Sequence, residues 1–285
     1  MDRFHEHLPD YPEKKIRFFA RLAAISALLG MFFMLVMDGI FRLLLFGDLL
    51  IILSPFGPIL GVGIVELTGF LLVYKFWKKK NKLLKKLSNK AYQKALKYAL
   101  IGIPFIIINM VHTYFPTDLL IPISSVDYVT GFLSRSLTEI FIGFSILDIT
   151  IRSIIGLLSL IVGIITTFRT ISVFGMDYMG LVYVYYPEES EVQHHEIYSI
   201  LRHPTYFALF ILGLGGVIIR FSLYSIIFYV MLICGMMIHI YYVEEKELIN
   251  RFGDSYKKYQ KNVPAILIKP KDIGRFIKFL IGKQN

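Results

Sequence analysis

Apolar runs of membrane-spanning length dominate this chain of 285 residues. A transmembrane helix needs roughly 20 consecutive apolar residues, and several uninterrupted runs approach or exceed that length. Apolar residues make up 55% of the chain, and the mean hydropathy is +0.61. The sequence therefore predicts an all-α fold, a polytopic transmembrane helical bundle that crosses the bilayer several times.

We expect about six spans, close to residues 18–45, 49–74, 95–111, 154–167, 206–219 and 223–242. The segment 131–150 carries Arg135, Glu139 and Asp148 between apolar patches, and we expect it to lie in the membrane interface or to re-enter the membrane. The dense basic loop at residues 75–90 belongs on the cytoplasmic side by the positive-inside rule. With six spans, the N-terminus and the lysine-rich C-terminus lie on that side too.

Charge and cysteine content indicate which bonds, metal sites and partners we do not expect. Cys234 is the single cysteine, so the fold has no intrachain disulfide and no cysteine-rich zinc site. His194 and His195 lie among glutamates in a charged loop that we expect to be solvated, and we expect no metal site. The net charge of +10 fits cytoplasmic loops and attraction to membrane lipids, so we expect no nucleic-acid partner.

Two polar blocks flank the last two expected spans. The first contains Arg202 and His203, and the second begins with Glu244 and Glu245. Because the two spans form a tight antiparallel hairpin, both blocks reach the same membrane face. Ionisable groups at that depth are costly unless they are paired or used, so the sequence predicts a polar site at the edge of the bilayer.

The two blocks together resemble the isoprenylcysteine carboxyl methyltransferase and phospholipid methyltransferase family of integral membrane enzymes. The resemblance covers about Gly175 to Ile268 and depends on Tyr198, Arg202-His203-Pro204-Thr205-Tyr206, Glu244-Glu245, Leu248, Phe252-Gly253, Tyr256, Tyr259 and Val263-Pro264. It implies S-adenosylmethionine as methyl donor in a cytoplasmic cofactor pocket and a lipid-like acceptor from the bilayer. By position it implies cofactor contacts from Tyr198, His203, Pro204, Thr205, Tyr206 and Glu244.

The chemistry of this cofactor agrees with those residues. S-adenosylmethionine is a zwitterion with an added sulfonium, so its site needs a carboxylate for the ammonium, a donor such as His203 for the carboxylate, and aromatic faces. Many family members have an arginine where this chain has Ile240, and their small-residue stretch with a histidine is replaced by residues 188–196. Gln193, His194 and His195 are therefore further candidate contacts. Tyr256 and Tyr259 either join them or form an interfacial aromatic belt.

The candidate catalytic residues are Arg202, Glu245 and His239. Methyl transfer from a sulfonium is an in-line displacement, which alignment and exclusion of water can accelerate without a covalent nucleophile. A carboxylate acceptor attacks as the anion, whereas an ammonium must first lose a proton to a base. His239, His203 and Glu245 are the candidate bases, although Glu245 and Glu247 also fit a solvated helix face.

We divide the chain into an N-terminal transmembrane region, residues 1–150, and a methyltransferase core, residues 151–285. The preferred function is methyl transfer to the carboxylate of a prenylated cysteine or a related isoprenoid. One alternative is a phospholipid amine N-methyltransferase. Another is a sterol-reductase-like membrane reductase that uses NADPH, in which an asparagine usually follows the Arg-His pair. The acids Asp38 and Glu66 within expected spans motivate the last alternative, a transporter or binding scaffold.

Overall fold

The computed structural model describes residues 6–11, 13–175 and 181–283. These residues form helices and no strand, with one isolated antiparallel bridge between Ser136 and Ser222. The α-helices are α2 (Glu13–Leu44), α3 (Gly47–Leu53), α4 (Phe56–Lys78), α5 (Lys80–Leu87), α6 (Ala91–His112), α7 (Tyr128–Ser134), α8 (Leu137–Phe141), α9 (Ile146–Phe174), α11 (Val182–Tyr185), α12 (Pro204–Arg220), α13 (Leu223–His239), α14 (Glu245–Phe252), α15 (Asp254–Asn262) and α16 (Ile273–Leu280). Short 3-10 turns lie at Ser88–Lys90, Pro187–Glu189, Glu196–Ser199 and Pro270–Asp272, and a π-helical turn lies at Ile240–Glu244.

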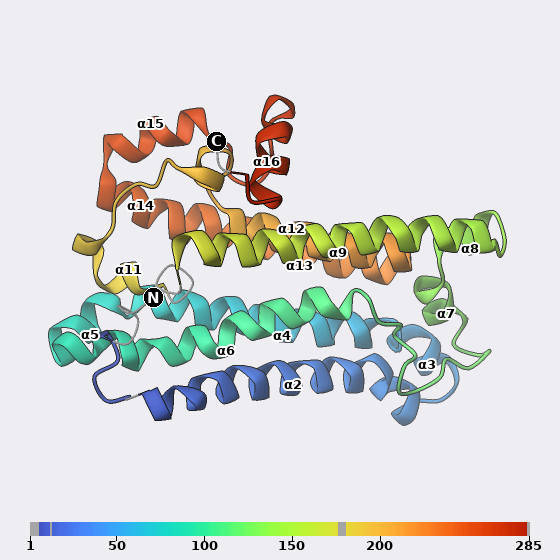
Figure 1. Cartoon of the computed structure of the whole chain (residues 1–285). Helices are drawn as coiled ribbons and strands as arrows, with labels where there is room; N and C mark the ends of the chain where they lie inside the picture. The colour runs from blue at the N-terminus through green and yellow to red at the C-terminus, as the bar shows by residue number, and fades with distance from the viewer. Residues whose placement is uncertain (1–5, 12, 176–180, 284–285) are drawn as a thin grey trace.

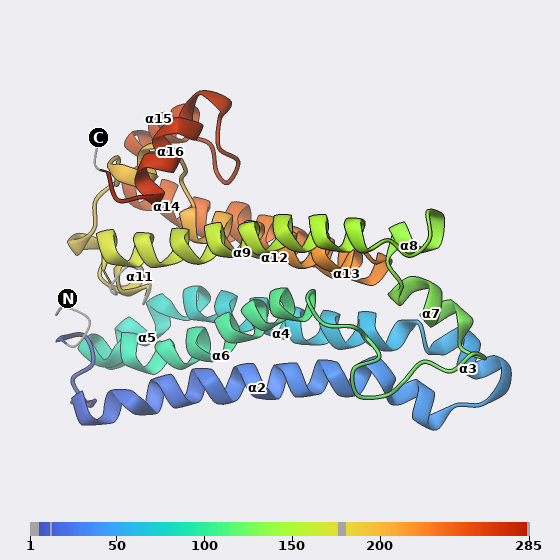
Figure 2. The ribbon, with the colours of Figure 1, turned by 45° about the vertical axis from the view of Figure 1, so that its right-hand side comes forward.

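The long helices run side by side in two layers (Figure 1). One layer contains α2, α4 and α6, which pack on one another, and the other contains α9, α12 and α13. Helix α9 packs along α12, and α13 packs against α4 and joins the two layers. The short helices α14, α15 and α16 gather at one end of the bundle (Figure 2).

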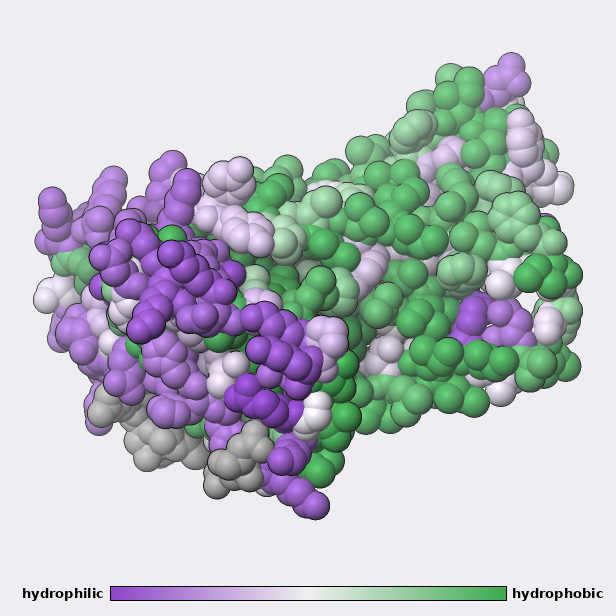
Figure 3. Space-filling model, turned by 90° about the horizontal axis from the view of Figure 1, so that it is seen from above, coloured by the Kyte–Doolittle hydropathy of each residue, from purple (hydrophilic) through white to green (hydrophobic). Residues whose placement is uncertain are grey.

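Apolar side chains cover the sides of this bundle. Five helical stretches are long and apolar enough to cross a membrane: Arg17–Leu44, Phe56–Lys78, Lys80–His112, Ile146–Val173 and Leu223–Phe252. The shorter apolar helix Pro204–Arg220 is the sixth. In Figure 3, hydrophobic residues cover the right-hand part of the visible face, and hydrophilic residues gather at the other end, with the C-terminal helices. The all-helical, multi-pass membrane architecture is therefore confirmed.

Helix α5, which belongs to the basic loop, lies at the same end of the bundle as α14 and α15 (Figure 1). The start of α2 lies at this end as well, while α3, α7 and α8 lie at the other. The two basic regions thus share one side, as six spans require. That this side is cytoplasmic stays a prediction, and residues 1–5 lie outside the described part of the chain.

The fourth span is longer than the sequence indicates. Helix α9 begins at Ile146 and has 29 residues, whereas we expected a short span at 154–167 and an interfacial segment up to residue 150. Of the charges that favoured an interface, only Asp148 lies in α9, and it is paired there, because Arg152 Nε donates to Asp148 Oδ2 at 2.9 Å and Thr138 Oγ1 of α8 donates to the same oxygen at 2.7 Å. The rest of the ambiguous segment forms the short helices α7 and α8.

The two acids within the spans are paired across helices. His112 Nε2 lies 3.2 Å from Asp38 Oδ1, and Asn109 Nδ2 donates to Glu66 Oε2 at 2.5 Å. Arg42 of α2 donates to loop carbonyls, at Thr117 (2.7 Å) and Ile121 (2.8 Å). These pairs join α2 and α4 to α6 inside the first layer, which accounts for the acids as interhelical contacts.

The hairpin between α12 and α13 turns at Phe221, whose φ is +45°. Ser222 then caps α13 through a capping box with Ser225. Gly215 lies where α12 meets α9, and an added Cβ there would lie 2.8 Å from the carbonyl oxygen of Gly156. Small residues thus permit the close contact between α9 and α12. The tight turn keeps the two polar blocks at the same end of the hairpin.

Candidate active site

A cavity of about 310 Å³ lies at the open end of the α12–α13 hairpin, where α12 begins and α13 ends. Its lining comes from both layers and from the loops between them: α4, α6, α9, residues 181–206, the end of α13 and helices α14 and α15. Most of the lining surface is apolar, with a limited set of ionisable groups. This combination, at a volume within the usual ligand range of about 300–1,000 Å³, is typical of a small-molecule site.

The C-terminal segment holds the first polar block in place. The backbone N–H of Arg202 donates to the carbonyl of Pro264 at 2.9 Å, and that of His203 donates to Ala265 at 3.0 Å. Tyr259 also donates its hydroxyl to the carbonyl of Tyr198 at 2.6 Å. Pro204 then begins α12, where its missing N–H costs no hydrogen bond. The block is thus fixed from both sides at the cavity wall.

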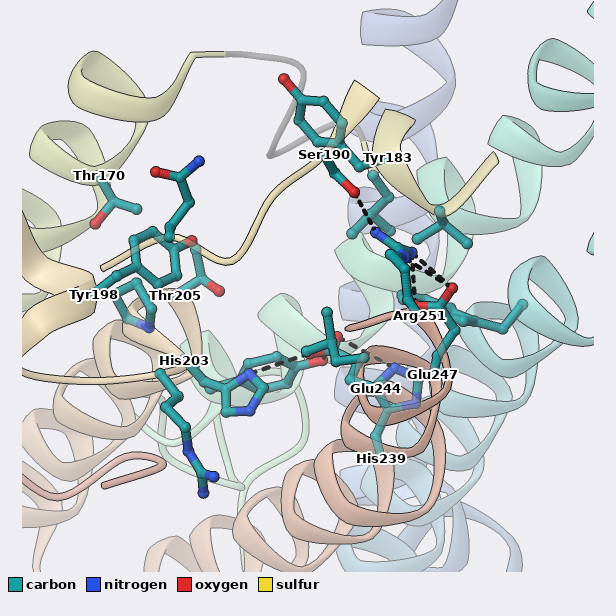
Figure 4. Close-up of a pocket in the computed structure, with 18 of the residues that line it drawn as sticks. Thr170, Tyr183, Ser190, Tyr198, His203, Thr205, His239, Glu244, Glu247 and Arg251 are labelled. Atoms are coloured by element: carbon teal, nitrogen blue, oxygen red, sulfur yellow. Dashed lines mark hydrogen bonds and ion pairs between the residues drawn. The ribbon is translucent and has the colours of Figure 1, made fainter. Parts of the chain in front are cut away.

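Glu244 lies between two imidazoles, as Figure 4 shows. Its Oε2 is 3.3 Å from His203 Nδ1, and its Oε1 is 3.6 Å from His239 Nε2. Tyr206 donates its hydroxyl to Glu244 Oε1 at 2.6 Å. All four residues line the cavity. The hairpin therefore brings residue 203 to residue 244 as predicted, with His239 on the far side of the carboxylate.

Glu245 makes a second, more deeply buried set of contacts. It is 2% exposed, and its Oε1 lies 2.9 Å from Arg202 Nη2 and 3.3 Å from His203 Nε2. Gln260 donates to Oε2 at 2.7 Å. The expectation that Glu245 sits on a solvated face is wrong, because these partners bury it. It is also absent from the cavity lining, so a catalytic role for Glu245 stays a prediction without geometric support.

His203 thus lies between two carboxylates. Burial disfavours its charged form, but hydrogen bonds and charge from Glu244 and Glu245 outweigh burial and raise the pKa of His203. Protonated His203 together with Arg202 balances the two acids. The site therefore favours an imidazolium at 203, a hydrogen-bond donor in both directions.

Some of the other predicted cofactor contacts line the cavity and some do not. Gln193, Tyr198, Thr205, Tyr256 and Tyr259 line the cavity. Tyr256 and Tyr259 are buried rather than part of an exposed aromatic belt. Burial raises the pKa of Tyr256, and its hydroxyl has no hydrogen-bond partner among the described residues. The cavity wall therefore offers a neutral donor that the protein itself does not use.

Neither His194 nor His195 lines the cavity. His194 instead packs edge-on against Tyr259, with ring centroids 5.0 Å apart. Within the described ranges, no group of three or more His, Cys, Asp or Glu side chains is arranged to hold a metal ion. The two histidines thus contribute to packing and surface in this structure, and their predicted cofactor role has no geometric support.

Sequence reasoning missed two parts of the lining. The first is an apolar wall from the N-terminal region, which consists of Val73, Trp77, Ile103, Ile106 and Ile107. The second is a polar rim at which Arg251 donates to both carboxylate oxygens of Glu247, at 2.7 and 2.6 Å, and to Ser190 Oγ at 3.1 Å. Only the position of Trp77 at the end of a span hinted at the first part.

These features define a helical membrane protein with charged side chains on the wall of a mostly apolar cavity. Comparison with known proteins shows which family part of the chain resembles. Residues 151–255 match the family model described as phospholipid methyltransferase. A stretch of 69 residues is 33% identical to the Protein-S-isoprenylcysteine O-methyltransferase of Schizosaccharomyces pombe. It covers 24% of this chain and 29% of that protein. No solved structure matches the chain.

Residues 151–255 thus match the family that the two sequence blocks predicted, whose methyltransferases use S-adenosylmethionine. The match begins earlier than expected, at the start of α9, and ends within α15. Residues 176–180, which fall inside the region of resemblance, lie outside the described residues. The chain spans less than a third of the length of the curated relative it matches.

Proposed function

We propose that this chain is an integral membrane methyltransferase that uses S-adenosylmethionine to methylate the carboxylate of a prenylated cysteine or a related isoprenoid. The observation that carries the proposal is the pair of His203 and Glu244 on the wall of an otherwise apolar cavity, within the segment that matches the family. The division into an N-terminal region and a core at residues 150 and 151 stays a prediction.

The residues present fit the cofactor. Glu244 is a carboxylate with 16% of its side chain exposed, which suits an ammonium group. Tyr198 and Tyr206 supply aromatic faces for a sulfonium or an adenine. Two groups are donors for a carboxylate: the hydroxyl of Tyr256, which has no hydrogen-bond partner in the described part of the chain, and the imidazole of His203, whose charged form Glu244 and Glu245 favour. When bound, the cofactor supplies an electrophilic methyl group.

The chain's own residues orient the reactants and exclude water. Glu245, which is paired with Arg202, contacts His203 on the side away from Glu244, and the C-terminal segment fixes the backbone of His203. The imidazole and the carboxylate of Glu244 therefore reach the cavity in one fixed arrangement. Preorganised groups of this kind can supply much of a rate enhancement without a covalent nucleophile.

The apolar wall from α4 and α6 supports a lipid-like acceptor. Trp77 contacts His239 edge-on, with centroids 5.1 Å apart, and Ile107 on the same wall is 38% exposed on the side of the bundle. An isoprenoid chain would gain about 0.8 kcal/mol for each methylene buried on such a surface. A carboxylate acceptor needs no deprotonation, which agrees with a site whose two acids favour the charged form of His203.

A phospholipid amine is the second candidate acceptor. His239 favours it, since its Nε2 has no hydrogen bond among the described residues and lies 3.6 Å from Glu244 Oε1. Such an imidazole is placed to accept a proton from an ammonium. The description of the matching family model also names phospholipid methyltransferase.

Labelled methyl donor distinguishes the two acceptors. The purified protein in nanodiscs is incubated once with a prenylcysteine analogue and once with a lipid extract, and His239→Gln is the matched variant. Label in the prenylcysteine methyl ester, retained in His239→Gln, supports the proposal. Label only in phosphatidylethanolamine products, lost in His239→Gln, overturns the acceptor. Binding of NADPH instead of S-adenosylmethionine would overturn the methyltransferase assignment altogether.

A further inference from the structure

The C-terminal helix α16 carries two apolar faces, and the protein covers only one of them. Phe276 and Phe279 are buried, and Phe276 packs edge-on against Phe207 of α12 with centroids 5.3 Å apart. Ile273, Ile277 and Ile281 follow one another at intervals of four residues and are 49%, 52% and 61% exposed. Residues four apart share a helix face, so these isoleucines form one exposed apolar stripe.

Basic side chains lie on α16 at Lys278 and just before and after it at Lys271 and Lys283. Lys271, Lys278 and Lys283 are exposed, and at 100° per residue Lys278 lies about 100° around the helix from Ile277. Arg275 points elsewhere, since it pairs with Asp272 at 3.0 Å and with Ser199. A helix with an apolar stripe and flanking lysines is typical of segments that lie in a membrane surface rich in anionic lipid.

The position of α16 agrees with such a surface. Its axis runs across the long axis of the bundle, at the side of the molecule and near the end with the C-terminal helices (Figures 1 and 2). Arg169 of α9 donates to the carbonyl of Phe279 at 3.1 Å, and the preceding residue, Phe168, is 68% exposed on the apolar side of the bundle. Helix α16 therefore lies beside the last lipid-facing turns of α9.

We propose that α16 lies in the plane of the membrane surface, with Ile273, Ile277 and Ile281 among the acyl chains and its lysines on the headgroups of acidic phospholipids. Each lysine near an anionic surface strengthens such binding about fivefold. Removal of three charges therefore weakens it by roughly 100-fold, and salt screens it over the Debye length.

Helix α16 is connected by direct contacts to the polar block that contains Arg202 and His203. Arg275 contacts Ser199 directly, and Phe276 packs on Phe207, one turn into α12 from His203. The segment before α16 also accepts the backbone hydrogen bonds of Arg202 and His203. Acidic lipid bound at α16 thus positions residues 196–203, and its consequence for catalysis depends on the proposed function.

A fluorescent label tests the membrane contact without any methyl transfer. In a Cys234→Ser background, Ile277→Cys and Asp254→Cys carry an environment-sensitive label in nanodiscs of phosphatidylcholine with or without phosphatidylserine. Asp254 is the water-facing control, because its side chain is 95% exposed. We expect lipid-attached quenchers to act at position 277 only, more strongly with phosphatidylserine. Equal access of iodide to both positions, with no effect of phosphatidylserine, would overturn the proposal.

Charge variants and hydrogen exchange test the remaining steps. The triple variant of Lys271, Lys278 and Lys283 to Gln is expected to lose the phosphatidylserine effect. The matched triple variant of Lys257, Lys258 and Lys261 to Gln on α15 removes the same charge and is expected to keep it. Phosphatidylserine should also slow hydrogen exchange at residues 196–203. Equal losses in both triple variants would overturn lipid recognition by α16, and unchanged exchange would overturn its coupling to the site.

Discussion

The substitution Glu244→Gln tests the central geometry most directly. It preserves the shape of the side chain and leaves an oxygen to accept the hydroxyl of Tyr206, which lies at 2.6 Å. It removes the negative charge that faces the cavity and the imidazoles of His203 and His239. Because Glu245 still pairs with His203, the imidazole keeps one anionic partner and the fold should survive.

The expected loss of cofactor affinity follows from the charge. A hydrogen bond to a charged group contributes about 1.5–3 kcal/mol. Losing one such contact with an ammonium raises the dissociation constant of S-adenosylmethionine about 10- to 150-fold. The neighbouring substitution Glu245→Gln is expected to behave differently, since Glu245 does not line the cavity. It breaks a buried ion pair with Arg202 and should lower stability by about 3 kcal/mol.

Calorimetric titration of the protein in nanodiscs measures the dissociation constant, and thermal unfolding measures stability. Glu139→Gln provides a further control, because this exposed acid lies at the opposite end of the bundle in a loose pair with Arg135 at 4.0 Å. Wild-type affinity in Glu244→Gln would refute the assignment of this carboxylate to the cofactor. An equal loss in Glu139→Gln would show that the effect is not local.

Three further outcomes are expected. The pKa of His203 is raised from 6.5, so its ion pairs stabilise the fold fully below that value and are lost as pH rises through the raised pKa. The melting temperature in detergent should therefore fall above neutral pH, and His203→Asn should flatten this dependence. Gly156→Ala places a Cβ 2.8 Å from the carbonyl of Gly215 and should cost about 1–3 kcal/mol in unfolding, whereas Gly274→Ala on α16 meets nothing within 4 Å and should gain up to about 1 kcal/mol. Trp77→Ala removes part of the apolar wall and should lower kcat/KM for a prenylated acceptor about 10- to 150-fold, with the dissociation constant of S-adenosylmethionine unchanged. Equal losses of kcat/KM and of affinity for S-adenosylmethionine would contradict an acceptor role for this wall.

The pairing of residues 203 and 244 was predictable because it depends on connectivity. Two apolar stretches separated only by Arg220, Phe221 and Ser222 must run antiparallel. The start of the first stretch and the end of the second therefore lie at the same end of the hairpin. The same reasoning could not place Trp77. Its contact with His239 depends on how α13 packs against α4, and helix packing in lipid follows side-chain fit that apolar composition does not reveal.

Glu244 faces the cavity and Glu245 is buried beside it, a difference in orientation that hydropathy cannot predict. A regular α-helix turns 100° per residue, so residues 239 and 244 would lie about 140° apart and face different ways. In the structure, residues 240–244 form a π-helical turn, whose hydrogen bonds join residues five apart. That turn sets Glu244 above His239, with Nε2 and Oε1 3.6 Å apart.

The extra residue in the π-helical turn also rotates Glu245 toward Arg202 and Gln260 and away from water. Adjacent carboxylates thus acquire separate tasks, one facing the cavity and one buried behind its wall. No residue pattern in the Ile240–Glu244 segment distinguishes a π-turn from an α-turn: Ile240 is buried and Tyr241 and Tyr242 are exposed, and the segment contains no proline or glycine. The chemistry of this site therefore depends on a local change of helix type, which becomes visible only when the surrounding helices are packed.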